Sequence, residues 1–166
     1  DRKGVCDVGA YELQMSPQVR NRALHLGNVQ ASYDPTPAPN APAGVFTFST
    51  RFTNKAATAL RDPFFKVTIL TGGNLLLNAS TGDGKMGSTL SGPDEVAPGA
   101  NFTVDFTIGL QRRQLFIFFV DAYALPTADV TAAEVEADSN APGFDFAVNA
   151  EQLQIESTIY LPLIER

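Results

Sequence analysis

The sequence predicts an all-β fold, an antiparallel β-sandwich of about seven to nine strands. Apolar and polar residues alternate along several segments, which is the pattern of strands with one face in a core and one in solvent. Turn-forming residues separate these segments at intervals of about ten residues, a spacing typical of sandwiches and barrels. The composition agrees, because the chain has 12 Phe and no Trp beside many Thr, Val and Ile. Aromatic and β-branched side chains pack well on a pleated sheet.

The first long strand is expected over residues 23–33, and a proline-rich segment follows it at 34–44. Four prolines in this segment favour an extended, polyproline-like conformation and exclude both a helix and a central strand. The segment is either an interdomain linker or a long loop, and the strand before it favours the loop. Alternation then resumes, with Phe46, Phe48 and Phe52 on one face of a predicted strand.

The middle of the chain predicts further strands joined by short turns. Phe65, Val67 and Ile69 fall on one face, and residues 71–74 offer a tight hairpin turn into a strand over 75–78. A second turn at 97–100 leads into another alternating strand. Its apolar face is predicted to carry Phe102, Val104, Phe106, Ile108 and Leu110, with Thr103, Asp105 and Thr107 opposite.

The last third of the chain is more varied. Residues 115–120 are apolar on both faces, which predicts a central strand covered on each side. Only 131–137 indicates a helix, because Thr131 and Glu134 have the spacing of a capping box. Strand-like alternation resumes in the tail, with Phe144, Phe146, Val148, Leu153, Ile155 and Ile159.

Charge and cysteine content exclude several classes of function. The net charge is −6, and residues 121–165 hold nine acids with no Lys or Arg, so phosphate backbones are repelled and no nucleic-acid partner is expected. The single cysteine, Cys6, and the single histidine, His25, preclude an intrachain disulfide and a Cys/His zinc cluster. The longest apolar run, 115–126, is shorter than the roughly 20 residues of a spanning helix, so no membrane span is expected.

The motifs of enzymes are weak in this chain. Residues 82–87 match G-x-G-x-x-G, but Gly92, Pro93, Pro98 and Gly99 preclude the helix that a dinucleotide site requires. A glycine-rich loop is predicted there instead. No G-x-S-x-G motif accompanies His25, which falls in a predicted strand. We therefore expect no catalytic residues and no enzymatic activity.

Calcium is the one metal that the sequence suggests. Five acids crowd a segment without basic residues, and carboxylates on flexible loops are the ligands that Ca²⁺ takes. No EF-hand loop accompanies them, so a solvated acidic loop is the alternative. The candidate ligands are Asp129, Glu134, Glu136, Asp138 and Asp145.

Residues 6–12, Cys-Asp-Val-Gly-Ala-Tyr-Glu, resemble the phrase that closes many secreted bacterial parallel β-helix proteins, similar to polymorphic outer-membrane proteins. The resemblance implies that residues 1–16 are the closing segment of an upstream β-helix and that residues 17–166 form the sandwich. It also implies an extracellular or cell-surface location. The chain would then be the C-terminal part of a larger secreted protein.

Residues 97–108 resemble the Pro-Gly turn and following strand of Ig-like or fibronectin-like repeats on bacterial surfaces, some described as adhesion modules. Together the two resemblances imply a non-catalytic accessory domain that caps the β-helix of the same chain, mediates adhesion to a cell-surface glycan or protein, or does both. The alternative is a carbohydrate-binding module of a polysaccharide-degrading β-helix enzyme. With no Trp, its aromatic platform would have to come from Phe and from Tyr11, Tyr33, Tyr123 or Tyr160.

Overall fold

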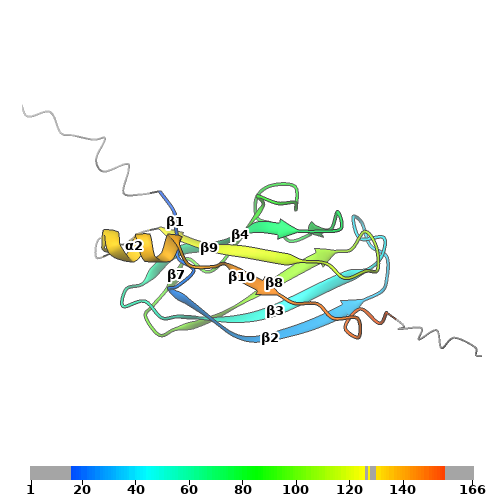
Figure 1. Ribbon diagram of the computed structural model, residues 1–166, viewed down its shortest axis with the longest axis horizontal. Helices are drawn as coiled ribbons and strands as arrows, with labels where there is room; N and C mark the ends of the chain where they lie inside the picture. The colour runs from blue at the N-terminus through cyan, green and yellow to red at the C-terminus, as the bar shows by residue number, and fades with distance from the viewer. Residues whose placement is uncertain (1–15, 126, 128–129, 156–166) are drawn as a thin grey trace, which may run out of the picture.

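The computed structural model describes residues 16–125, 127 and 130–155. They form two antiparallel sheets packed face to face, with a short helix at one end (Figure 1). This confirms the predicted β-sandwich. The expected closing segment at 1–16 lies, except for Ser16, outside the described residues, as do Asp129, Ile159 and Tyr160.

A six-stranded sheet has β9 (Phe118–Leu125) and β4 (Leu60–Leu70) at its centre. On its edge away from β4, β9 pairs with β1 (Gln18–Val19) and β10 (Phe144–Phe146). On its edge away from β9, β4 pairs with β6 (Thr89–Ser91) and β7 (Glu95–Val96). The four-stranded sheet has the order β2 (Leu24–Asp34), β3 (Val45–Asn54), β8 (Asn101–Gly109) and β5 (Leu75–Leu76). The described residues thus hold ten strands, whereas seven to nine were expected. The excess comes from very short strands, since β1, β5 and β7 have only two residues each.

Phenylalanine rings from both sheets fill the space between the layers. Phe48 of β3 stacks on Phe118 of β9, with ring centroids 5.9 Å apart. Phe65 of β4 meets Phe106 of β8 edge-on at 5.5 Å. Each such pair contributes roughly 0.5–1.5 kcal/mol beyond the burial of its surface. The alternation in the sequence therefore placed Phe48, Phe65 and Phe106 in the core correctly.

The proline-rich segment connects two paired strands, β2 and β3, and is a loop rather than a linker. The Tyr33 hydroxyl donates to the Ala43 carbonyl at 2.7 Å, and Ala38 and Ala41 form a small bridge within the loop. Gly44 has a φ of 99°, and a Cβ there would lie 2.3 Å from the Asp34 carbonyl oxygen. Only glycine fits this closing turn.

Two predictions for β4 and its continuation were wrong. Ile69 is 42% exposed, because the pairing of β4 with β9 shifts register between Val67 and Ile69 and turns Ile69 out of the core. Residues 71–74 do form a turn, but it is not a hairpin. Strand β5 after it pairs with β8 of the other sheet, so the turn carries the chain from one layer to the next.

The predicted strand at 115–120 begins later than expected. Leu115 and Ile117 are 55% and 50% exposed, and β9 starts at Phe118. Once started, β9 does occupy a central position between β4 and the β1/β10 edge. Leu115 and Ile117 belong to the connection from β8, whereas Phe116 between them is buried against Phe46 and Phe48.

The expected helix is present as α2 (Ala132–Ser139), and its capping box is confirmed. The Thr131 hydroxyl accepts from the Glu134 backbone N–H, and the Glu134 carboxylate accepts from the Thr131 N–H at 2.8 Å. These contacts satisfy donors that the first turn of a helix leaves unpaired. No helix among the described residues is long and apolar enough to cross a bilayer.

Candidate functional site: a groove at the open edge of β8

Strand β8 is fully paired on one side and only partly paired on the other. Strand β3 runs along its whole length, but β5 pairs with only Gly109 and Ile108. The ladder is then extended by one backbone bond, from Leu77 N–H to the Thr107 carbonyl at 2.7 Å. The N-terminal half of β8 therefore has no neighbouring strand on this side within the described chain.

The side chain of Asn78 ends the ladder. Its amide nitrogen donates to the Asp105 carbonyl at 2.7 Å, and its amide oxygen accepts from the Thr107 N–H at 3.1 Å. The N–H and C=O of one strand residue point to the same side, so Thr103 faces the same way as Asp105 and Thr107. No hydrogen bond from the described residues reaches the Thr103 N–H and C=O or the Asp105 N–H. These three groups form an open edge.

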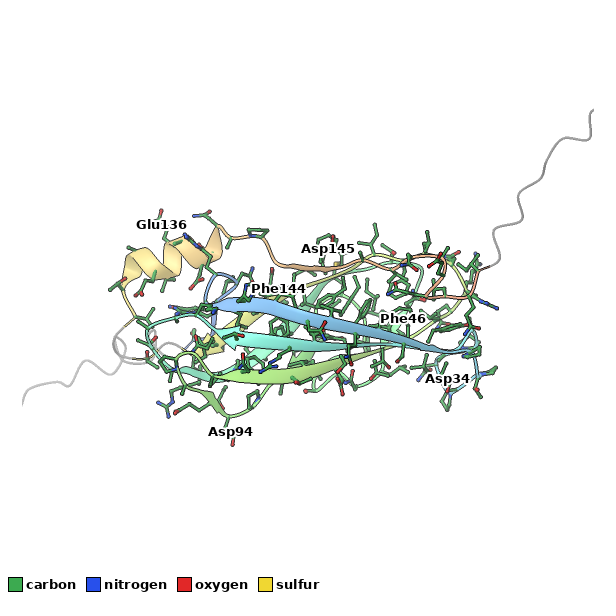
Figure 2. The ribbon with its side chains drawn as sticks, turned by 90° about the horizontal axis from the view of Figure 1, so that it is seen from below. Asp34, Phe46, Asp94, Glu136, Phe144 and Asp145 are labelled. Atoms are coloured by element: carbon green, nitrogen blue, oxygen red, sulfur yellow. The ribbon has the colours of Figure 1, made fainter. Side chains whose placement is uncertain are left out.

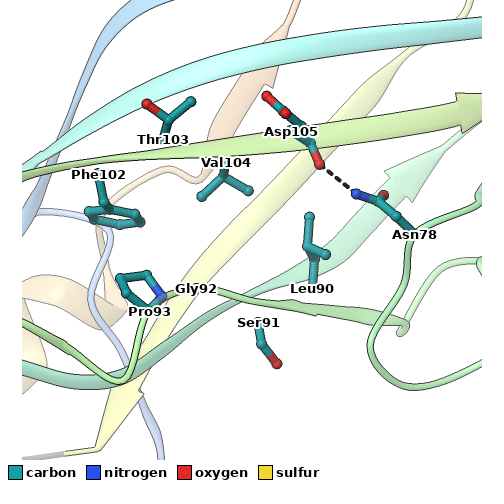
Figure 3. A pocket seen from close by; sticks show the side chains of 9 residues that line it. All are labelled: Asn78, Leu90, Ser91, Gly92, Pro93, Phe102, Thr103, Val104 and Asp105. Carbon is teal, nitrogen blue, oxygen red and sulfur yellow. Dashed lines mark hydrogen bonds between the residues drawn. The ribbon is translucent and has the colours of Figure 1, made fainter.

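A groove with a volume of about 340 Å³ lies beside this edge, between β8 of one sheet and β6 of the other (Figure 3). Its apolar lining comes from Leu90, Pro93, Phe102 and Val104, and its polar lining from Asn78, Ser91, Thr103 and Asp105. Gly92 lets the chain after β6 approach β4 closely, because a Cβ there would lie 2.9 Å from the Pro63 carbonyl oxygen. The groove thus combines free backbone groups with an apolar floor.

The β6 side of the groove is better satisfied than the β8 side. Thr89 exchanges backbone hydrogen bonds with Thr81, and the Ser91 N–H donates to the Ser80 hydroxyl at 2.9 Å. The segment before β6 therefore covers its outer edge. What the groove offers to another molecule is mainly the edge of β8.

The calcium candidates are engaged elsewhere or stand apart. Glu134 serves the capping box, and hydrogen bonds from the Thr131 backbone and hydroxyl hold its pKa below the ordinary value. Asp138 is buried, pairs with Arg20 at 3.2 Å and accepts from the Arg22 N–H at 2.9 Å. Glu136 on α2 and Asp145 on β10 are exposed, well separated side chains (Figure 2). Among the described residues, which exclude Asp129, no three His, Cys, Asp or Glu side chains gather as metal ligands.

The other motifs take the places that the sequence predicted. Residues 82–87 form a loop in which Gly82, Gly84 and Gly87 have positive φ, and strand β6 rather than a helix follows. Gly84 N–H donates to the Ser88 hydroxyl at 2.9 Å, so the loop is closed on itself. His25 is exposed on β2.

Comparison with protein-family models, with curated proteins and with solved structures found no match. The groove itself is the basis for any functional conclusion.

An aromatic pair lies on the outer face of the six-stranded sheet. Phe64 of β4 and Tyr123 of β9 are half-buried and nearly parallel, with ring centroids 5.2 Å apart. Burial and then the nearby Asp121 charge raise the pKa of Tyr123 above its ordinary value. A second pocket of about 410 Å³ adjoins Phe64, and its polar lining includes Asp62, Asp94, Thr81, Thr89 and Ser91.

Sequence reasoning identified Tyr123 as a possible platform residue but missed both its partner and the groove. The local signal for Phe64 existed, since it alternates with the buried Phe65. The open edge of β8 had no local signal, because it depends on where the distant β5 stops pairing.

Proposed function

We propose that this sandwich is a non-catalytic accessory domain of a secreted or cell-surface bacterial protein, and that it binds an extended segment of a partner protein along β8. The single observation that supports this most is the open edge formed by Thr103 and Asp105 beside an apolar groove. The resemblance of residues 97–108 to Ig-like adhesion modules adds support, because 101–108 belong to this same strand.

An extended peptide is the occupant that suits this edge. Unpaired N–H and C=O groups at regular spacing are best satisfied by the backbone of another strand, which is the basis of β-strand addition. Alternate side chains of that strand would point into the groove, where Leu90, Phe102 and Val104 favour a small apolar group. Because three free backbone groups provide few hydrogen bonds, we expect the peptide to bind with modest affinity. We expect it to contain β-branched residues, which favour strands.

Strand β2 is the competing edge, and its geometry is less suitable. Its pairing with β3 shifts register between Leu26 and Val29, around Gly27. An irregularity of this kind bends an edge strand and discourages further pairing. The β8 edge has no such shift in its register with β3.

Amide exchange with a simple strand-forming peptide tests the proposal. We would titrate the ¹⁵N-labelled protein with a capped peptide of alternating Val and Thr, using the same peptide with every backbone nitrogen methylated as control. We expect slower exchange at Thr103 and Asp105 with the first peptide only, because the second is blocked on both of its edges. Equal protection by both peptides, or none by either, would contradict strand addition.

A pair of substitutions at one position separates backbone from side-chain binding. Thr103→Pro removes the free N–H at an edge position, where proline is tolerated, whereas Thr103→Ala keeps it. We expect the proline variant to lose peptide protection at Asp105 and the alanine variant to retain it. Retention in both variants would show that the Thr103 N–H is not used.

The capping role rests on the resemblance of residues 6–12 to the end of a β-helix. If the closing segment also packs on the sandwich, deletion of residues 1–14 should lower the melting temperature by several degrees. An unchanged melting temperature would restrict the proposal to partner binding.

The carbohydrate-binding alternative has one specific observation in its favour, the Phe64–Tyr123 pair beside carboxylates and hydroxyls. Sugars stack on aromatic rings and hydrogen-bond to such groups. A glycan array probed with the wild type and with Phe64→Leu distinguishes the two functions. A saturable hit that the variant loses would favour the carbohydrate module over strand addition.

A further inference from the structure

Another pocket, of about 340 Å³, lies between α2, the turn from β1 to β2 and the loop after β3. Three cationic side chains line it, those of Arg20, Arg22 and Lys55, together with the carboxylates of Glu134 and Asp138. The rest of its lining is alanine. Neither the strand-addition groove nor the aromatic pair contributes to this pocket.

Arg20 is buried but incompletely bonded. It is 3% exposed, and its Nε lies 3.2 Å from the Asp138 Oδ2. Neither Nε nor Nη1 makes an aligned hydrogen bond with the described residues. A guanidinium carries five N–H donors in a rigid fork, and buried donors left without partners are costly. Arg20 lines the pocket, so an anion bound there would approach this incompletely bonded guanidinium.

The backbone holds the three cations in a fixed frame. The Arg20 N–H donates to the Ala122 carbonyl of β9 at 2.8 Å, and the Lys55 N–H donates to the Ala23 carbonyl at 2.7 Å. The Arg22 N–H donates to Asp138, which ties the turn to α2. These bonds fix the backbone at the three positions, and all three side chains line the same pocket.

Charge and lining define the ligand class. Three cations and two carboxylates leave the pocket one positive charge in surplus, which a single negative charge neutralises. A dianion such as sulfate would leave the pocket with a net negative charge, and its second charge would be repelled by the two carboxylates. The alanine walls suit a short apolar body. We propose that this pocket binds a small organic monocarboxylate, held by the Arg20 guanidinium and assisted by Arg22 and Lys55.

The first measurement is an NMR titration of the whole protein with sodium propionate. Sodium chloride at equal ionic strength controls for screening, and sodium sulfate tests the preference for a single charge. We expect saturable shifts at Arg20, Arg22 and Ala133 with propionate, weaker ones with sulfate and none with chloride. Unsaturable shifts, or tighter binding of sulfate, would overturn the proposal.

Variants place the binding at this pocket. Arg22→Gln and Lys55→Gln change exposed side chains, and each should weaken propionate binding roughly two- to fivefold. Arg51→Gln makes the same charge change on the exposed face of β3 and should leave the affinity unchanged. Equal affinities in all three variants would overturn the proposal.

Arg20→Lys keeps the charge and removes the planar fork, and we expect it to weaken binding by roughly tenfold or more. Wild-type affinity in this variant would exclude the guanidinium as the main contact. If Arg20→Lys does not fold, Arg22→Gln and Lys55→Gln still test whether propionate binds in this pocket. Since these signals come from α2 and the β1–β2 turn, failure here is distinguishable from failure of strand addition, which is detected at Thr103 and Asp105.

Discussion

The side-chain amide of Asn78 takes the place of a peptide group beside β8, donating to the Asp105 carbonyl at 2.7 Å and accepting from the Thr107 N–H at 3.1 Å. One side chain thus continues the pairing that β5 begins and fixes the point where the open edge starts. The contacts link residues that are distant in sequence, so they also hold the loop after β5 against the four-stranded sheet.

This relationship predicts that Asn78→Asp destabilises the domain by about 1 kcal/mol. The aspartate keeps the acceptor for Thr107 but places a carboxylate oxygen against the Asp105 carbonyl. Asn101→Asp is the matched control, because the Asn101 oxygen accepts from the Thr53 hydroxyl and aspartate preserves that role. Guanidinium unfolding midpoints of the two variants decide; equal losses would contradict the role of the Asn78 donor.

The buried Arg20–Asp138 pair predicts a larger effect. Asp138→Asn keeps an acceptor for the Arg22 N–H but leaves the Arg20 charge without its partner, at a cost of about 3 kcal/mol. Asp83→Asn provides the comparison, because Asp83 and Lys85 form an ion pair in open solvent and should give no measurable change. A small effect at Asp138 would mean that water reaches Arg20.

The sequence was sufficient for features that depend on near neighbours. Alternation placed Phe46, Phe48 and Phe52 in the core, and the spacing of Thr131 and Glu134 located the helix start. Both signals arise from the periodicity of a single element.

Features that depend on distant pairing were missed. The turn at 71–74 has the residues of a hairpin, but its second strand pairs with β8, more than 30 residues later. The same long-range pairing decides where the edge of β8 opens, and the Arg20 pocket needs α2 to fold back over β1. None of these is encoded in a local window of sequence.

The register shift in β4 allows a direct test at two positions of one strand. Val67→Thr places a hydroxyl in the core at a residue that is 1% exposed, and should cost about 1–3 kcal/mol. Ile69→Thr makes a similar change on the solvent side of the shift and should stay within about 0.5 kcal/mol. Thermal unfolding of both variants checks this, and a reversed order would mean that Ile69 faces the core.

Metal removal has a defined expectation. Glu134 and Asp138 are committed to Thr131 and Arg20, so a calcium ion would have to displace both contacts. We expect the melting temperature to be the same with EDTA and with added Ca²⁺. A reversible rise with Ca²⁺ would instead support a site that includes Asp129, and Asp129→Asn should then abolish it.

The capping box predicts a specific acid sensitivity. Hydrogen bonds from the Thr131 backbone N–H and hydroxyl, with a smaller effect of the Arg20 charge, lower the pKa of Glu134 in the folded state. A carboxylate of this kind stabilises the fold fully above its unfolded pKa, about 4.3, and the contribution disappears as the pH falls through the lower folded value. Glutamine retains the acceptor oxygen and does not titrate. We therefore expect Glu134→Gln to lose less stability than the wild type between about pH 6 and about pH 3. Glu136→Gln is the control on the same exposed helix surface, and its loss should match the wild type. If Glu134→Gln and Glu136→Gln respond to acid alike, the capping contact does not contribute to stability in solution.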